Sequence, residues 1–355
     1  MRRLLTVLLA AAASLASAAP FAYITNQGSH DVSVIDLATQ QVVATVPVGR
    51  SPAGVVASSA RGRVFVSNPD SKNVSVIDMR TQTVVNTLPA GEGPVGIDAS
   101  PDGRWLLVVD WYGQRLLAWD GRGEQPLAVP VGRAPAGVAA HDREAVAFVA
   151  ERDDDSVAVV DLAQRRVRAR VRVGTHPFAL LHDAARQRVY ALNVQSDDVS
   201  VISVADLDAP RVVATLKVGK APYGAALAAG NRLLYVTNQH DDTVSVIDAD
   251  ALKPLRTLRG FGYPEGVAAA ADRVYVVNWM DDNVSVLDAD SGDAVRDAAR
   301  REEIGEGVRR ALLARECPAV NATLGSLRKH RHFNFTPVVQ FTRDERRSRT
   351  VMEVI

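Results

Sequence analysis

The chain has 355 residues, which is enough for one large domain or two of average size. Its apolar content of 47% and its charged content of 23% exclude a globally disordered protein. The formal net charge is zero, so no overall field favours binding to nucleic acid or to an anionic membrane. The single cysteine, Cys317, excludes an internal disulfide and a thiolate metal cluster within one chain.

Residues 1–18 have the pattern of a cleavable signal peptide. Arg2 and Arg3 are followed by an apolar run over residues 4–15 and by the small residues Ala16, Ser17 and Ala18, which suit a signal peptidase. The apolar run is short for a bilayer span, and no cysteine follows it to carry a lipid anchor. We therefore expect a mature protein without a membrane anchor that is periplasmic or secreted.

Residues 21–295 contain one unit that recurs seven times at spacings of 40 to 45 residues. Each unit begins with a short β-rich segment that ends in a polar anchor residue. The seven anchors are Asn26, Asn68, Asp110, Glu151, Asn193, Asn238 and Asn278. A fixed period of this length is typical of a repeat fold.

Three further segments follow each anchor in most units. In the second unit, residues 74–78 alternate Val or Ile with Ser, as expected of a half-buried strand. Residues 84–88 form a third strand, and a tight turn then runs from Gly91 to Pro94. A fourth segment of small residues, 96–99, completes the pattern.

Four short antiparallel strands in about 40 residues indicate a propeller blade. The sequence therefore predicts an all-β fold, a seven-bladed β-propeller with four-stranded blades over residues 21–295. We expect the small-residue segments to be innermost, because only Gly and Ala fit around a crowded axis. We also expect the Val-rich and Ile-rich second and third strands to pack between neighbouring sheets.

One unit is specific enough to indicate a family. Residues 235–238, Tyr-Val-Thr-Asn, followed by Val-Ser-Val-Ile-Asp at 244–248, resemble the defining repeat of the YVTN-family β-propellers, which are WD40-like in architecture. The resemblance covers about residues 21–295 and implies an exported seven-bladed propeller. Similar repeats occur in propellers encoded beside quinoprotein dehydrogenases, and the same fold class includes sugar lactonases. The resemblance thus implies a fold more strongly than a function.

The basic C-terminal segment, residues 296–355, departs from the repeat. Residues 296–315 have helical spacing of apolar residues, and residues 337–342 and 350–355 are predicted as the two strands of a hairpin. The last blade lacks a third strand and the ring lacks one inner strand, so we expect a tail strand to close the ring and cover its open edges. The alternative is a flexible tail that is separate from the ring.

The loops after the first strands and the Gly-x-x-Pro turns should share one face, because strand direction alternates within a blade. Cations in the turns favour a small anionic ligand at the channel mouth, and loop aromatics favour a contact surface. Solvated charges and packing at blade edges are the alternatives. The candidate ligand-binding residues are Arg50, Arg133, His176, Lys220, Tyr223, Trp111 and Trp279.

The sequence offers no metal site and no catalytic group. The acidic first-strand loops lack the spacing of a calcium loop, and turn formation explains their aspartates. The histidines are dispersed, and His330 and His332 would need outside ligands. Motifs for a nucleophile elbow, a zinc protease, a phosphate loop and haem attachment are missing.

Two classes of function remain open. The first is an exported, non-catalytic scaffold that binds an unknown protein or a small anionic ligand, without a cofactor, as a monomer. The alternative is an accessory subunit of a periplasmic quinoprotein-type dehydrogenase or a lactonase-like hydrolase. Binding to nucleic acid is not expected, because the body of the chain is acidic.

Overall fold

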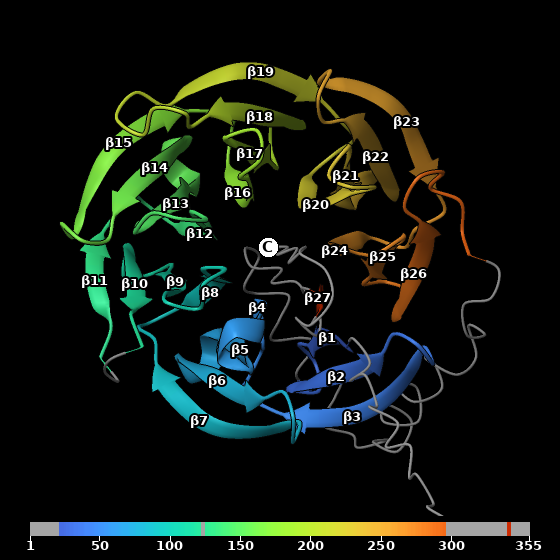
Figure 1. Cartoon of the computed structure of the whole chain (residues 1–355), viewed down its shortest axis with the longest axis horizontal. Helices are drawn as coiled ribbons and strands as arrows, with labels where there is room; N and C mark the ends of the chain where they lie inside the picture. The colour runs from blue at the N-terminus through green and yellow to red at the C-terminus, as the bar shows by residue number, and fades with distance from the viewer. Residues whose placement is uncertain (1–20, 122–124, 296–338, 342–355) are drawn as a thin grey trace, which may run out of the picture.

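The structure is a computed structural model that describes residues 21–121, 125–295 and 339–341. The predicted signal peptide, the predicted tail helix and most of the predicted tail hairpin lie outside these residues. Seven sheets are arranged around a central axis, and each has one edge strand nearest to that axis (Figure 1). The prediction of a seven-bladed β-propeller is confirmed.

Each blade is an antiparallel sheet whose strands follow one another from the axis outward. Blades one to four contain the following strands in order from inside to outside: β27 (Val339–Phe341), β1 (Phe21–Asn26), β2 (Asp31–Asp36) and β3 (Gln41–Pro47); β4 (Val55–Ser58), β5 (Arg63–Asn68), β6 (Asn73–Asp78) and β7 (Thr83–Pro89); β8 (Pro94–Ala99), β9 (Leu106–Asp110), β10 (Arg115–Trp119) and β11 (Leu127–Pro130); β12 (Pro135–Ala140), β13 (Val146–Glu151), β14 (Ser156–Asp161) and β15 (Arg166–Arg172).

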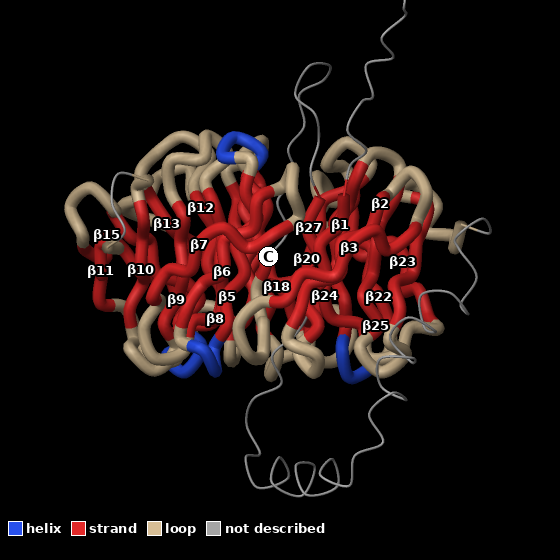
Figure 2. Tube along the Cα trace, turned by 90° about the horizontal axis from the view of Figure 1, so that it is seen from below, coloured by secondary structure: helices blue, strands red, loops and turns tan. Residues whose placement is uncertain are grey.

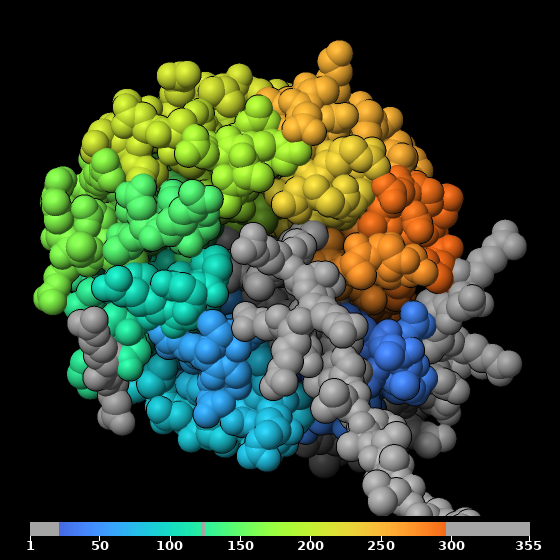
Figure 3. All heavy atoms as spheres, viewed as in Figure 1, coloured from blue at the N-terminus to red at the C-terminus, as the bar shows by residue number. Residues whose placement is uncertain are grey.

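The last three blades continue the same order. Blades five to seven contain β16 (Pro177–Asp183), β17 (Arg188–Asn193), β18 (Asp198–Ser203) and β19 (Arg211–Lys217); β20 (Pro222–Ala228), β21 (Leu233–Asn238), β22 (Thr243–Asp248) and β23 (Lys253–Arg259); and β24 (Pro264–Ala270), β25 (Arg273–Asn278) and β26 (Asn283–Asp288). Figure 3 shows the blades following one another around the ring in chain order.

The inner strands are made of small residues because they approach one another closely. A methyl group added to Gly137 on β12 would lie 2.4 Å from the carbonyl oxygen of Phe178 on β16. One added to Gly224 on β20 would lie 2.5 Å from the carbonyl oxygen of Glu265 on β24. Backbone at that distance cannot accommodate a side chain, so the prediction that small residues mark the innermost strands is confirmed.

The outer strands are more exposed than the sequence predicted. Six of the large hydrophobic residues that remain exposed lie on these strands: Val42, Val43, Val84, Val85, Val213 and Leu255. Only part of each outer strand reaches the core, as Val46, Leu88 and Leu216 do. The expectation that third strands pack between sheets was therefore wrong for most of their length. An outermost strand has no neighbouring sheet that could cover both of its faces.

The residues of the Tyr-Val-Thr-Asn motif have separate structural roles, which blade six illustrates. The Tyr235 hydroxyl donates to the carbonyl of Ala289 beyond blade seven, at 3.1 Å. The Thr237 hydroxyl donates to the carbonyl of Glu265 on β24, at 2.6 Å, and so ties blade six to blade seven. The Asn238 amide donates across the hairpin to the hydroxyls of Thr243 and Ser245, each at 2.9 Å. The motif thus encodes contacts between blades as well as strand structure.

Two blades replace the anchor asparagine with an acid and change its partners. Asp110 in blade three accepts from the backbone N–H groups of Glu92 and Gly93 and pairs with Arg115 at 3.0 Å. Glu151 in blade four pairs with Arg170 at 2.9 Å. Both carboxylates are fully buried.

The first blade takes its innermost strand from the far end of the chain. Strand β27 pairs antiparallel with β1, with Tyr23 opposite Gln340. Blade seven has three strands within the described residues. The inner position of blade one is thereby filled by residues that follow blade seven in the sequence.

The connections divide between two faces of the ring. We use the name turn face for the face that carries the Gly-x-x-Pro turns and the first-strand loops, and opposite face for the other. The first-strand loops contain the short 3-10 helices η2 (Pro69–Ser71), η3 (Arg152–Asp154) and η4 (Gln239–Asp241), whereas η1 (Ser59–Arg61) joins an inner strand to a first strand. Figure 2 accordingly shows one short helix at one rim and the others at the opposite rim. Among the described residues, no helix has the length and apolar character needed to cross a membrane.

Candidate functional site

The turn face is held together by hydrogen bonds from turn backbone to loop side chains. In four first-strand loops, a residue with positive φ accepts the N–H of the turn that leads to the next blade. The pairs are His30 with Ser51 at 3.1 Å, Asp155 with His176 at 2.9 Å, Asp197 with Ala221 at 2.9 Å and Asp242 with Tyr263 at 2.9 Å. Each bond joins a turn to the blade that precedes it.

Three of these turns, and the turn of Arg133, are also bound to the following blade. The N–H groups after the turn glycines donate to side chains of the next first-strand loop: Arg50 to Ser71, Arg133 to Asp154, Thr175 to Ser196 and Lys220 to Asp241, at 2.7 to 3.0 Å. The turns at residues 50–51, 175–176 and 220–221 are therefore fixed from both sides. The aspartates named here hold backbone turns, as the sequence analysis favoured over cation binding.

The three predicted cations lie at separate places on this face. Arg50, Arg133 and Lys220 follow β3, β11 and β19, so two blades separate each from the next (Figure 1). The Arg133 guanidinium pairs with Asp154 at 2.7 Å and donates to the carbonyl of Asp153 at 2.6 Å. Hydrogen bonding to Asp154 raises the pKa of Arg133 and keeps it protonated. Arg50 likewise donates to the carbonyl of Asp70 at 3.1 Å. The structure does not bring these cations to one point.

His176 and Tyr223 lie at the start of inner strands. Burial, with Arg152 as the next cause, lowers the pKa of His176. The Tyr223 ring packs against Phe178 with centroids 4.6 Å apart. The rings of Phe178 and Tyr223 line a small cavity of about 60 Å³ between the inner strands. Tyr223 therefore lines this cavity between the inner strands, whereas His176 lies in the turn before β16.

The two predicted tryptophans differ in environment. Trp111 is half-buried, packs against the apolar core between blades three and four, and lies 5.7 Å below the Arg152 guanidinium. Trp279 is 40% exposed, and the neighbouring Met280 is 64% exposed. In blade three the exposed aromatic is Tyr112, at 57%. Trp111 thus follows the packing alternative, and Trp279 remains available at the surface.

Trp279 belongs to a row of rings that crosses from blade six to blade seven. The ring of Tyr263 lies 5.5 Å from that of Trp279 and 5.6 Å from that of His240. His240 Nε2 and the Tyr263 hydroxyl are 3.2 Å apart. We call these three rings, together with Met280, which follows Trp279 in the chain, the aromatic row. The sequence analysis selected only Trp279, because loops of two blades supply the row.

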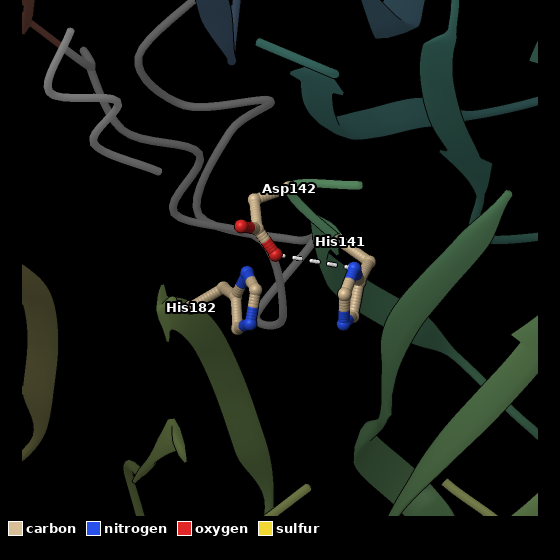
Figure 4. Close-up of side chains that lie close together, drawn as sticks. All are labelled: His141, Asp142 and His182. Atoms are coloured by element: carbon tan, nitrogen blue, oxygen red, sulfur yellow. Dashed lines mark ion pairs between the residues drawn. The ribbon is translucent and has the colours of Figure 1, made fainter. Parts of the chain in front are cut away.

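A second cluster lies on the opposite face and was missed from the sequence. His141 and Asp142 follow β12, and His182 lies near the end of β16, so blades four and five both contribute (Figure 4). One potential ligand atom from each residue lies within 4.8 Å of the others. Burial, followed by the charge of His141, lowers the pKa of His182 to about 4. A usable signal was present, since both histidines stand at the same ends of adjacent inner strands.

Comparison with known proteins places the architecture among β-propellers. Residues 55–146 match the model of the YNCE-like β-propeller family. No curated protein matches the chain by sequence. Among solved structures, a functionally unknown protein from Desulfotomaculum acetoxidans is similar, with a TM-score of 0.68 and 13% identity over 78% of this chain and 94% of that one.

Two further similar structures belong to enzymes. Hydrazine synthase from Kuenenia stuttgartiensis has a TM-score of 0.60 and 19% identity, over 72% of this chain and 81% of that one. Dihydro-heme d1 dehydrogenase NirN has a TM-score of 0.61 and 20% identity, over 78% of this chain and 62% of that one. At these identities the likeness concerns the fold alone. The chain is a seven-bladed β-propeller whose residues 55–146 match the YNCE-like β-propeller family.

Proposed function

We propose that this protein is an exported, non-catalytic scaffold that binds another protein through the aromatic row on its turn face. The observation that carries the proposal is the exposure of Trp279 and Met280, at 40% and 64%, beside a turn that is hydrogen-bonded to the loops of both blade six and blade seven. Exposed aromatic and methionine side chains are typical of the energetic centre of protein interfaces. A pre-organised surface also loses little conformational entropy on binding.

The charges around the row indicate the character of the partner. Asp241 and Asp242 lie in the loop of blade six, and Asp281 and Asp282 follow Met280 in blade seven. Burial, followed by the charge of Asp281, raises the pKa of Asp282, as expected when carboxylates crowd together. A partner with an apolar side chain flanked by lysine or arginine would complement this surface.

A site-specific crosslinking experiment tests this surface. A photoreactive phenylalanine analogue replaces Met280 in one variant and Leu255 in a control variant. Leu255 is a matched control because it is 50% exposed but lies on the outer strand β23. We expect one discrete crosslinked species from position 280, identified by mass spectrometry, and none from position 255. Asp281→Lys with Asp282→Lys should abolish it. Equal crosslinking at both positions would contradict the proposal.

Two further measurements address the remaining parts of the proposal. N-terminal sequencing of the mature protein should give Ala19 as the first residue, because the small residues 16–18 precede it. The purified protein should show no turnover of lactone or amine substrates. Robust turnover would favour the hydrolase or dehydrogenase alternative.

A further inference from the structure

The opposite face carries a pocket of about 340 Å³ at the junction of blades four and five. His141 and Asp142 enter it from the connection between β12 and β13, and His182 enters it from β16. The imidazole rings lie 5.0 Å apart between centroids, tilted by 33°. The ring of Phe148 packs against both, at 6.2 and 5.3 Å. Two histidines and a carboxylate from two blades thus share one pocket wall.

We propose that His141, Asp142 and His182 form a binding site for a divalent transition-metal cation, with Zn²⁺ as the best match. Two imidazoles and one carboxylate are a common ligand set for such cations. Three protein ligands also leave a coordination position for water or for another small ligand. The proposal concerns a different face from the aromatic row and does not depend on it.

The spacing of His141 and Asp142 already suits a metal. His141 Nδ1 lies 3.2 Å from Asp142 Oδ1. In a tetrahedral shell with bonds of about 2.0–2.1 Å, neighbouring ligand atoms are about 3.3 Å apart. The potential ligand atoms of all three residues lie within 4.8 Å. A shift of about 1–2 Å at His182, within the reach of a side-chain rotation, would complete the shell.

The loop after β12 fixes the position of the His141 ring through two hydrogen bonds. Nδ1 accepts the backbone N–H groups of Arg143 and Glu144, at 3.1 and 3.2 Å. These two bonds hold the ring beside Asp142, and a cation bound at Nδ1 would take their place.

The charge of the pocket also favours a cation. Its lining includes the carboxylates of Asp142, Glu144 and Asp206 and the guanidinium groups of Arg143 and Arg168. The Arg168 group is occupied by Asp208, to which it donates two hydrogen bonds of 2.5 and 2.6 Å. Arg143 is 86% exposed and pairs with Oδ2 of Asp142 at 3.1 Å, whereas Oδ1 of Asp142 lies on the side of His141. The lining therefore contains three carboxylates against two guanidinium groups, both of which are engaged in ion pairs.

Metal binding to the full-length protein tests the proposal. After chelator treatment and dialysis, the chain is titrated with Zn²⁺ and, separately, with Co²⁺. We expect one bound ion per chain by elemental analysis, a higher melting temperature with Zn²⁺, and a visible absorption band with Co²⁺. Binding favours the folded state and should also join blades four and five. Asp142→Asn and His141→Ala should each weaken binding at least tenfold.

Two control variants make the result specific. His240→Ala removes a histidine from the turn face, and His330→Ala with His332→Ala removes two histidines that follow the propeller in sequence. We expect both to bind the ion as the parent does. His182→Gln is compared with the parent by melting temperature without metal, so that unfolding is separated from loss of a ligand. Failure to bind either ion, or binding lost only in the His330 and His332 variant, would overturn the proposal.

Discussion

The buried carboxylate of Asp98 on β8 accepts a hydrogen bond of 2.7 Å from the backbone N–H of Ala140 on β12. Its other oxygen accepts the N–H of Ala99, also at 2.7 Å. The residue is only 3% exposed, and burial raises the pKa of Asp98 to about 7 despite these bonds. One side chain thus joins the inner strands of blades three and four in a site that disfavours its own charge.

We predict that Asp98 contributes stability that is lost as pH rises through neutrality. An unfolded aspartate has a pKa of about 3.9. Between that value and about 7, the folded state holds a proton that the unfolded chain releases, so the free energy of unfolding decreases with rising pH. Urea unfolding of the parent and of Asp98→Asn at pH 5, 6, 7 and 8 measures this slope as the difference between the two, which cancels the opposite contribution of His182, whose pKa is lowered to about 4.

The variant Asp98→Asn assigns the slope to this residue. Asparagine keeps one acceptor oxygen, loses the second, and cannot ionise, so the variant is less stable at pH 5. The deficit should shrink towards pH 8 as the parent loses stability. A deficit that is constant with pH would contradict the assignment. Asp36→Asn, in an exposed turn, is the control for removing a carboxylate.

We predict that Asn238→Ala destabilises the protein by about 1–3 kcal/mol. The Asn238 amide is buried and donates to Thr243 and Ser245, and alanine would remove the donor that both hydroxyls use. Urea unfolding of Asn238→Ala, Ser245→Ala and the double variant gives the coupling energy. Strict additivity of the two changes would show that the hydrogen bond contributes nothing.

We predict that Arg170→Ala lowers the free energy of unfolding mainly because it leaves the charged carboxylate of Glu151 without its partner. The Glu151 carboxylate is fully buried and also accepts the N–H of Gly132 and the hydroxyl of Ser156. Removing Arg170 leaves a buried anion, which we expect to cost about 2 kcal/mol, since the arginine itself is 49% exposed. In a Glu151→Gln background the same change should cost much less. Equal losses in both backgrounds would rule out the charge as the cause.

We predict that Gly137→Ala destabilises the ring by about 1–3 kcal/mol or more, because its methyl group would meet the Phe178 carbonyl at 2.4 Å. Gly28→Ala is a matched control, since no atom lies within 4 Å of its added methyl group. That variant should stay within about 0.5 kcal/mol of the parent. Melting temperatures of the two variants are the measurement, and similar values for both would contradict close packing of inner strands.

Most of the fold could be predicted from the repeat, because the sequence signals for its strands and turns are local. The alternation of Val and Ser at 244–248 marks a strand, and Gly219 to Pro222 marks a reversal, because these preferences act within a few residues. The exposure of Val43 and Val85 was not foreseen, because identical apolar strands are covered or bare according to their distance from the axis. The roles of Thr237 and Tyr235 in joining blades were likewise invisible in a single unit.

By itself, the sequence determined that seven units of about 40 residues form a ring of sheets, since no unit can bury its own apolar faces. Tertiary structure alone decided which distant side chains meet. It placed His182 beside His141 and Asp142, and His240 beside Tyr263 and Trp279, across blade boundaries. The physical reason is that strand order within a blade follows local backbone preferences, whereas contact between blades depends on the geometry with which the whole ring closes.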